Sequence, residues 1–200
     1  MISYLKKYHN HILFFSILFI IGFFLGISFA IKNKIFLEEQ INYYISNIDN
    51  IKCEYLLFHF FILNVSFILS IVGLSPIFSS TITFYEGMSS GFTITLFTMT
   101  LGFNGLFYGI SFFIMTKLLY LLLSFIFYIK CLSISLDRIK SYLLKNTPTI
   151  SYKLRLKGML ICFIIIMIYD ILLSIYARDW LSLFKFLIMW YNTKRGELYA

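Results

Sequence analysis

The sequence predicts an all-α polytopic bundle of five to six membrane helices with its N terminus in the cytoplasm. The first observation is composition. The 200 residues are 60% hydrophobic and 13% charged with a mean hydropathy of +0.86, whereas a soluble domain is about half apolar and a quarter charged. The second is that apolar residues fall into runs near the ~20 residues that span hydrocarbon. The third is that basic residues cluster between two runs, as in a cytoplasmic loop. We expect a single integral membrane domain covering residues 1–200.

The first predicted span covers residues 12–31 and follows Lys6 and Lys7. A signal peptide is the alternative, because Ser28-Phe29-Ala30 is a passable cleavage site. The run is longer than the apolar core of a usual signal peptide, so an uncleaved membrane helix is favoured. In the mixed-charge loop that follows, apolar residues over 35–45 have roughly helical spacing. We interpret this stretch as an amphipathic helix on the outer membrane surface, either a face for a partner or a connector resting on lipid.

Two further spans, residues 55–73 and 77–99, meet at Gly73 and Pro76 without a polar loop between them. The third span carries small residues at positions that share one stripe of a helix at about 100° per residue. They are Ser80, Thr83, Gly87, Gly91, Thr95 and Thr98. Small-residue stripes let a second membrane helix approach closely, and Gly22 and Gly26 form a similar face on the first span.

Short glycine motifs follow one another along these spans. They are Gly22 and Gly26, then Ile71-Val72-Gly73-Leu74-Ser75-Pro76, then Glu86-Gly87-Met88-Ser89-Ser90-Gly91-Phe92, then Gly102-Phe103-Asn104-Gly105. In order and spacing this series resembles the stage II sporulation protein M family of bacterial membrane proteins. The family usually has a lysine where this chain has Glu86, and prolines in the helix that here carries Lys117. The resemblance implies a multi-pass bundle, a hinge at Gly102 and Gly105, and a scaffold role without catalysis. In sporulating hosts the scaffold serves the machinery that remodels peptidoglycan during engulfment.

The C-terminal half continues the pattern. A fourth span is predicted over 106–129, a fifth over 158–177, and a short sixth segment over 180–191 that either spans or lies at the interface. Between the fourth and fifth spans, we predict a cytoplasmic loop over 133–157. Its basic residues are Arg138, Lys140, Lys145, Lys153, Arg155 and Lys157, against Asp137 alone. By the positive-inside rule this loop and the N terminus both lie in the cytoplasm.

Three ionisable residues, Glu86, Lys117 and Asp170, fall inside predicted spans. A charge at the bilayer centre costs about 2.5–3.5 kcal/mol on insertion scales, so each should be paired or face the protein interior. Glu86 and Lys117 reach similar depths on consecutive antiparallel spans, which predicts an ion pair. We expect Asp170 nearer the outer leaflet, with neighbours beside Asn64 or Tyr128 as its hydrogen-bond partners. Two interpretations remain open: a proton or ion path, or a buried pair that fixes helix register, which we favour.

No catalytic, cofactor-binding or metal site is expected. The sequence lacks a zinc-protease motif, paired carboxylates outside the membrane and a phosphate-binding loop. The cysteines predict no disulfide framework, and the histidines have no metal-ligand spacing and are expected at the interface. These residues are Cys53, Cys131, Cys162, His9, His11 and His59.

The net charge of +8 is explained by cytoplasmic loops and anionic lipid rather than by nucleic acid. The expected partners are the lipid bilayer of the bacterial cytoplasmic membrane and other membrane or cell-wall-remodelling proteins. The alternative is a permease-like or accessory transporter subunit, whose basic loop docks an ATPase subunit.

Overall fold

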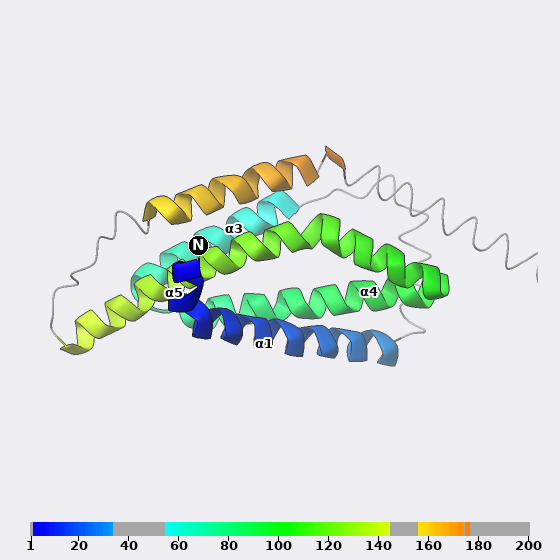
Figure 1. Ribbon diagram of the computed structural model, residues 1–200, viewed down its shortest axis with the longest axis horizontal. Helices are drawn as coiled ribbons and strands as arrows, with labels where there is room; N and C mark the ends of the chain where they lie inside the picture. The colour runs from blue at the N-terminus through cyan, green and yellow to red at the C-terminus, as the bar shows by residue number, and fades with distance from the viewer. Residues whose placement is uncertain (1, 34–54, 145–155, 174, 177–200) are drawn as a thin grey trace, which may run out of the picture.

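The computed structural model describes residues 2–33, 55–144, 156–173 and 175–176 (Figure 1). The expected amphipathic segment 35–45 and the sixth segment 180–191 lie outside these residues. The labelled helices are α1 (Ile2–Lys32), α3 (Tyr55–Val72), α4 (Ser75–Phe113), the π-helix η2 (Ile114–Leu118) and α5 (Leu119–Leu144). A further helix, Leu156–Leu173, is called the last helix below. Every regular element of the described residues is helical, so the predicted all-α class is confirmed for them.

Three of the described helices are long and apolar enough to cross a membrane: His9–Lys32, Gly102–Leu143 and Leu156–Leu173. Leu57–Val72 is a shorter apolar helix. Their outward side chains are largely apolar and exposed, for example Phe24, Ile68 and Ile164. So much exposed apolar surface is typical of helices whose outer faces meet lipid.

Helix α4 is a hairpin of two antiparallel arms. Gly102 has φ 61° and ψ −139° inside the element, a conformation that side chains with a Cβ rarely adopt. The chain reverses there, as the green ribbon in Figure 1 shows. The ring of Phe97 on the first arm lies 5.3 Å from that of Tyr108 and 5.4 Å from that of Phe112 on the second. The resemblance implied a hinge at Gly102 and Gly105, and the structure has its chain reversal at Gly102.

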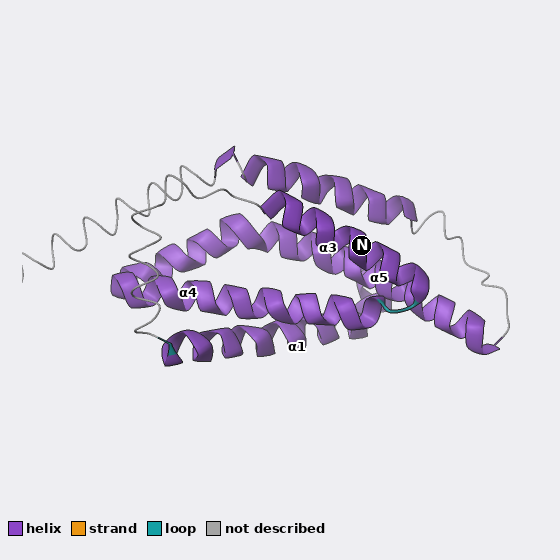
Figure 2. Cartoon of the chain, turned by 180° about the vertical axis from the view of Figure 1, so that it is seen from behind, coloured by secondary structure: helices purple, strands orange, loops and turns teal. Residues whose placement is uncertain are grey.

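The connection between α3 and α4 is a tight turn without polar residues. Gly73 has φ 94°, and the Leu74 amide donates to the Leu69 carbonyl at 2.9 Å. Pro76 occupies the first turn of α4, where its missing N–H removes no helical hydrogen bond. Figure 2 shows this turn in teal at the end of the bundle. The predicted kink at Gly73 and Pro76 is therefore the turn that sets α3 antiparallel to the first arm of α4.

The closest helix contact joins α1 to the first arm of α4. A Cβ at Gly22 would overlap the carbonyl oxygen of Phe84, and a Cβ at Gly26 would overlap that of Met88. The contact is reciprocal on the other helix. Gly87 and Gly91 lie against the backbone carbonyls of Phe19 and Phe23 in α1.

Residue numbers rise together along both helices, so α1 and the first arm run parallel, as the neighbouring ribbons in Figure 1 show. The glycines remove the side chains that would otherwise hold the two backbones apart. Two small-residue faces that the sequence predicted separately thus meet each other.

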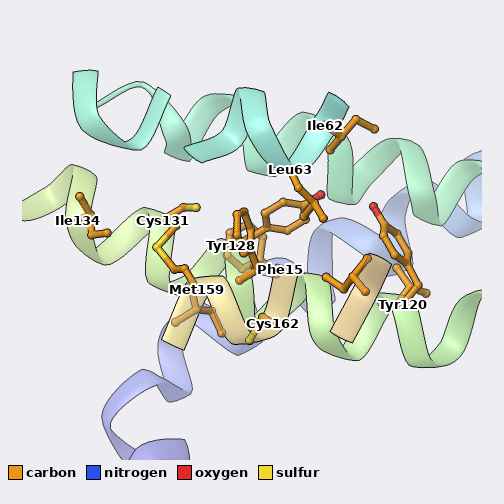
Figure 3. Close-up of a cluster of buried hydrophobic side chains, with 13 residues drawn as sticks. Phe15, Ile62, Leu63, Tyr120, Tyr128, Cys131, Ile134, Met159 and Cys162 are labelled. Atoms are coloured by element: carbon orange, nitrogen blue, oxygen red, sulfur yellow. The ribbon is translucent and has the colours of Figure 1, made fainter. Parts of the chain in front are cut away.

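The apolar core lies among α1, α3, α5 and the last helix (Figure 3). Its largest fully buried side chains are Tyr120, Tyr128, Phe15 and Phe127. The ring of Phe15 lies 6.2 Å from Phe125 and 6.3 Å from Tyr128, which ties α1 to α5. This core holds the helices that carry the polar groups described below.

The predicted loop over 133–157 is wrong in its first part, because α5 continues to Leu144. Ile134 and Ser135 are buried, and the Ser135 hydroxyl donates to the Ser70 carbonyl at 3.2 Å. Ile139 lies against Gly73 in the α3–α4 turn. Asp137, Arg138 and Lys140 of the predicted loop are part of this helix, the first two half-buried and the third exposed, so they interrupt hydropathy without interrupting helical structure.

We predict that Gly26→Val disrupts the contact between α1 and α4. The new side chain would overlap the Met88 carbonyl, and overpacking of this kind costs about 1–3 kcal/mol. The measurement is thermal unfolding of the purified protein in detergent. Leu25→Val is the matched control, because Leu25 is exposed on the same helix. Equal melting of Gly26→Val and the wild type would contradict the role given to this glycine.

Candidate functional site

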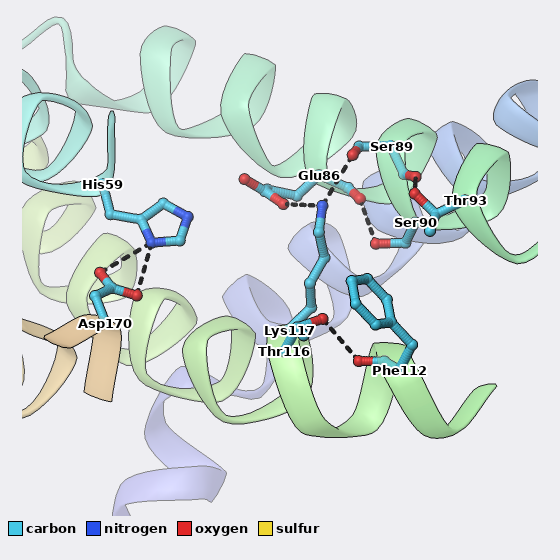
Figure 4. A network of polar contacts seen from close by, with 9 residues as sticks. All are labelled: His59, Glu86, Ser89, Ser90, Thr93, Phe112, Thr116, Lys117 and Asp170. Carbon is cyan, nitrogen blue, oxygen red and sulfur yellow. Dashed lines mark hydrogen bonds and ion pairs between the residues drawn. The ribbon is translucent and has the colours of Figure 1, made fainter. Parts of the chain in front are cut away.

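A buried ion pair joins the first arm of α4 to η2. The Lys117 ammonium donates to Glu86 Oε2 at 3.1 Å and to Ser89 Oγ at 2.9 Å (Figure 4). The Glu86 side chain is 5% exposed and the Lys117 side chain 19%. The pair that the sequence predicted is therefore present, and its carboxylate is the more deeply buried partner.

The lysine of this pair lies in an irregular turn. Residues Ile114–Leu118 form a single π-helical stretch between two α-helical segments. A π turn inserts an extra residue into the helix and changes the direction of the side chains that follow, and such bulges are frequent at functional sites. This turn carries Lys117 at the point where its ammonium meets Glu86.

A second buried pair joins α3 to the last helix. Nδ1 of His59 lies 3.0 Å and 2.9 Å from the two carboxylate oxygens of Asp170. An ionised carboxylate only accepts hydrogen bonds, so this geometry assigns a proton to Nδ1. The two side chains are 7% and 0% exposed. In Figure 4 the imidazole and the carboxylate point toward each other from different helices.

The expected surroundings of His59 and Asp170 were wrong. His59 is buried rather than interfacial, and Asp170 pairs with it rather than with groups beside Asn64 or Tyr128. Asn64 donates instead to the Phe60 carbonyl of its own helix at 2.7 Å. A signal was present in the sequence, because His59 shares a helical stripe with two serines. Those residues, Ser66 and Ser70, are both fully buried.

Tyr120 brings the two pairs into one layer. It follows Lys117 by three residues in the chain, and its ring stacks on His59 with centroids 3.7 Å apart and planes 11° from parallel. We call His59, Glu86, Lys117, Tyr120 and Asp170 the polar layer. Its members come from α3, α4, η2, α5 and the last helix.

Three hydroxyls of the buried region have no hydrogen-bond partner within the described part of the chain: Ser66, Tyr120 and Tyr128. Most buried polar atoms in proteins are hydrogen-bonded, so such groups call for an explanation. Each can still donate one hydrogen bond and accept another. Of the three, only Tyr120 belongs to the polar layer, which therefore combines two paired sets of side chains with one hydroxyl that has no such bond.

The predicted glycine positions act in packing and chain reversal. Gly22, Gly26, Gly87 and Gly91 form the contact between α1 and α4, and Gly102 forms the hairpin, with the buried Gly105 three residues beyond it. Gly73 and Pro76 form the turn before α4. None of these residues belongs to the polar layer, although Gly87 directly follows Glu86.

Within the described residues, no group of three or more His, Cys, Asp and Glu side chains is placed to hold a metal ion. Cys131 and Cys162 are buried free thiols. Comparison with known proteins gave no match to a family model, to a curated protein or to a solved structure. The arrangement of the site is therefore the evidence from which a function is inferred.

We predict that Glu86→Gln and Lys117→Met are each more destabilising than the double variant. Either single change leaves one buried charge without its partner, at about 3–5 kcal/mol, whereas the double change removes both charges. The measurement is a double-mutant cycle of unfolding free energies in mixed micelles. Lys140→Gln, at an exposed position of α5, controls for loss of a surface charge. Additive losses would contradict the coupling.

Proposed function

We propose that the protein is a multi-pass protein of the bacterial cytoplasmic membrane with its N terminus in the cytoplasm. Support comes from the three helices of spanning length and composition and from their apolar outer faces. The start of α1, the end of α5 and the start of the last helix lie at one end of the bundle (Figure 1). The basic segment between α5 and the last helix thus connects to the same end as the N terminus, as the positive-inside rule requires.

We propose further that the protein acts as a non-enzymatic scaffold that binds other membrane or cell-wall-remodelling proteins. The observation that supports this best is that every charged member of the polar layer is paired, Glu86 with Lys117 and His59 with Asp170. Paired charges hold four helical segments in one arrangement, and the outward faces stay free to contact partners. The resemblance to the stage II sporulation protein M family adds the class of partner, enzymes that remodel peptidoglycan.

A second function is favoured by one specific observation. The layer contains an imidazole, two carboxylates, an ammonium and a tyrosine hydroxyl, a longer series of titratable groups than the sequence indicated. Intramembrane series of this kind mark proton and ion paths in transporters. On this basis the alternative is a permease-like or accessory subunit that works with an ATPase.

The proposed orientation predicts opposite labelling of two exposed positions. Asn104→Cys and Lys140→Cys are made separately in a variant whose native cysteines are replaced by alanine. Position 104 lies beside the Gly102 hairpin, and position 140 lies near the end of α5. We expect a membrane-impermeant maleimide to label position 104 in intact cells and position 140 only after permeabilisation. Labelling of position 140 in intact cells would reverse the orientation.

The scaffold function predicts which proteins remain bound when the tagged full-length chain is purified from its own membranes. We expect cell-wall hydrolases among them, identified by mass spectrometry and absent from a purification of an unrelated tagged membrane protein. The Glu86→Gln/Lys117→Met double variant should retain the same partners, because a neutral pair replaces a charged one. Recovery of an ATPase subunit that is lost in this variant would overturn the scaffold and favour transport.

A further inference from the structure

An open apolar groove of about 650 Å³ separates α3 and α5 from the last helix. Its volume falls within the range of about 300–1,000 Å³ that is usual for small-molecule sites. Leu63 and Phe67 line it from α3, Phe127 from α5, and Leu160 and Phe163 from the last helix. The polar layer lies elsewhere on the same helices, so the groove is a separate feature.

An ammonium group marks one end of this groove. Lys157 lines it directly. Among the described residues this ammonium has no ion-pair or hydrogen-bond partner. An unpaired cation beside an apolar wall attracts an anion that carries apolar substituents.

The dimensions indicate what kind of apolar substituent fits. From Lys157 to Phe163 the last helix rises by about 9 Å, at about 1.5 Å per residue, along a wall of leucine and phenylalanine side chains. An extended hydrocarbon chain can lie along such a wall with its charged end at Lys157. Basic pockets between membrane helices bind anionic lipid head groups in this way.

We propose that this groove binds an anionic glycerophospholipid, with one acyl chain along Leu160 and Phe163 and the phosphate at Lys157. The inference rests on the proposed membrane location and does not depend on the scaffold role. Lys157 lies at the end of the bundle that we assign to the cytoplasm, where the anionic lipids of the inner leaflet are found.

The test is native mass spectrometry of the full-length protein in neutral detergent, titrated with dioleoylphosphatidylglycerol or dioleoylphosphatidylcholine. We expect tighter binding of the anionic lipid. Lys157→Gln should weaken that binding about fivefold, the effect of one basic residue at an anionic surface. Lys140→Gln, a charge change at an exposed position of α5, is the matched control and should leave binding unchanged.

The acyl chain is tested separately with Leu160→Trp, a change at a site that is 60% exposed and therefore compatible with folding. We expect it to reduce the binding of both lipids by filling the groove. Equal binding of the two lipids, or a Lys157→Gln variant that binds like the wild type, would overturn the proposal. It would also be overturned if inorganic phosphate competes with the lipid while Leu160→Trp has no effect. A dimer of the chain that Leu160→Trp dissociates would overturn it as well, because a second copy would then occupy the groove. These results would leave the orientation test unaffected, so the two failures are distinguishable.

Discussion

The direct backbone contact between α1 and α4 is the constraint on which the remaining structure depends. Gly87 faces α1, and in a helix the preceding residue points about 100° away from it. The contact therefore directs Glu86 away from α1 and toward the returning arm, where Lys117 meets it. Close packing supplies the driving force between membrane helices, because lipid is as apolar as the side chains. The glycine faces thus determine both the position of α4 and the direction of its charge.

The hydroxyl side chains of α4 allow the helix to be polar in composition and still lie in an apolar bundle. Thr83, Ser90 and Thr95 each donate to the carbonyl four residues earlier, at 2.8, 2.6 and 2.8 Å. Hydroxyls bonded in this way require no partner on a neighbouring helix. Among the described residues, most polar contacts between helices are consequently made by the polar layer, and the bond from Ser135 to Ser70 is a further one. The Glu86–Lys117 and His59–Asp170 pairs fix which helices lie side by side, and loss of one partner leaves the other buried without it.

The sequence predicted those parts of the fold that depend on local spacing. The Gly102 hairpin, the turn at Gly73 and the Glu86–Lys117 pair all follow from residues on consecutive helices, whose relative depth is set by a short connection. The His59–Asp170 pair depends on how the last helix packs against α3, and 111 residues separate the two side chains. Hydropathy contains no information about that packing.

The length of α5 was missed for a related reason, because a few charged residues within a helix resemble a loop when hydropathy is averaged along the chain. The burial of the Tyr120 and Tyr128 hydroxyls was also beyond sequence reasoning, because it depends on which helices surround them.

The two candidate functions make different demands on the mobility of the last helix. It is attached to α3 at two levels, by Asp170 on His59 and by the contact between Phe163 and Phe60, whose rings lie 5.7 Å apart. Toward Lys157 this helix still packs against α5 through the buried Met159, and the groove opens beside that contact. A scaffold requires this helix to stay in one position, and a lipid chain in the groove would add contacts at that end. A transport path requires the same helix to move, and movement would separate Asp170 from His59. The stability of that single pair therefore distinguishes a fixed bundle from a mobile one.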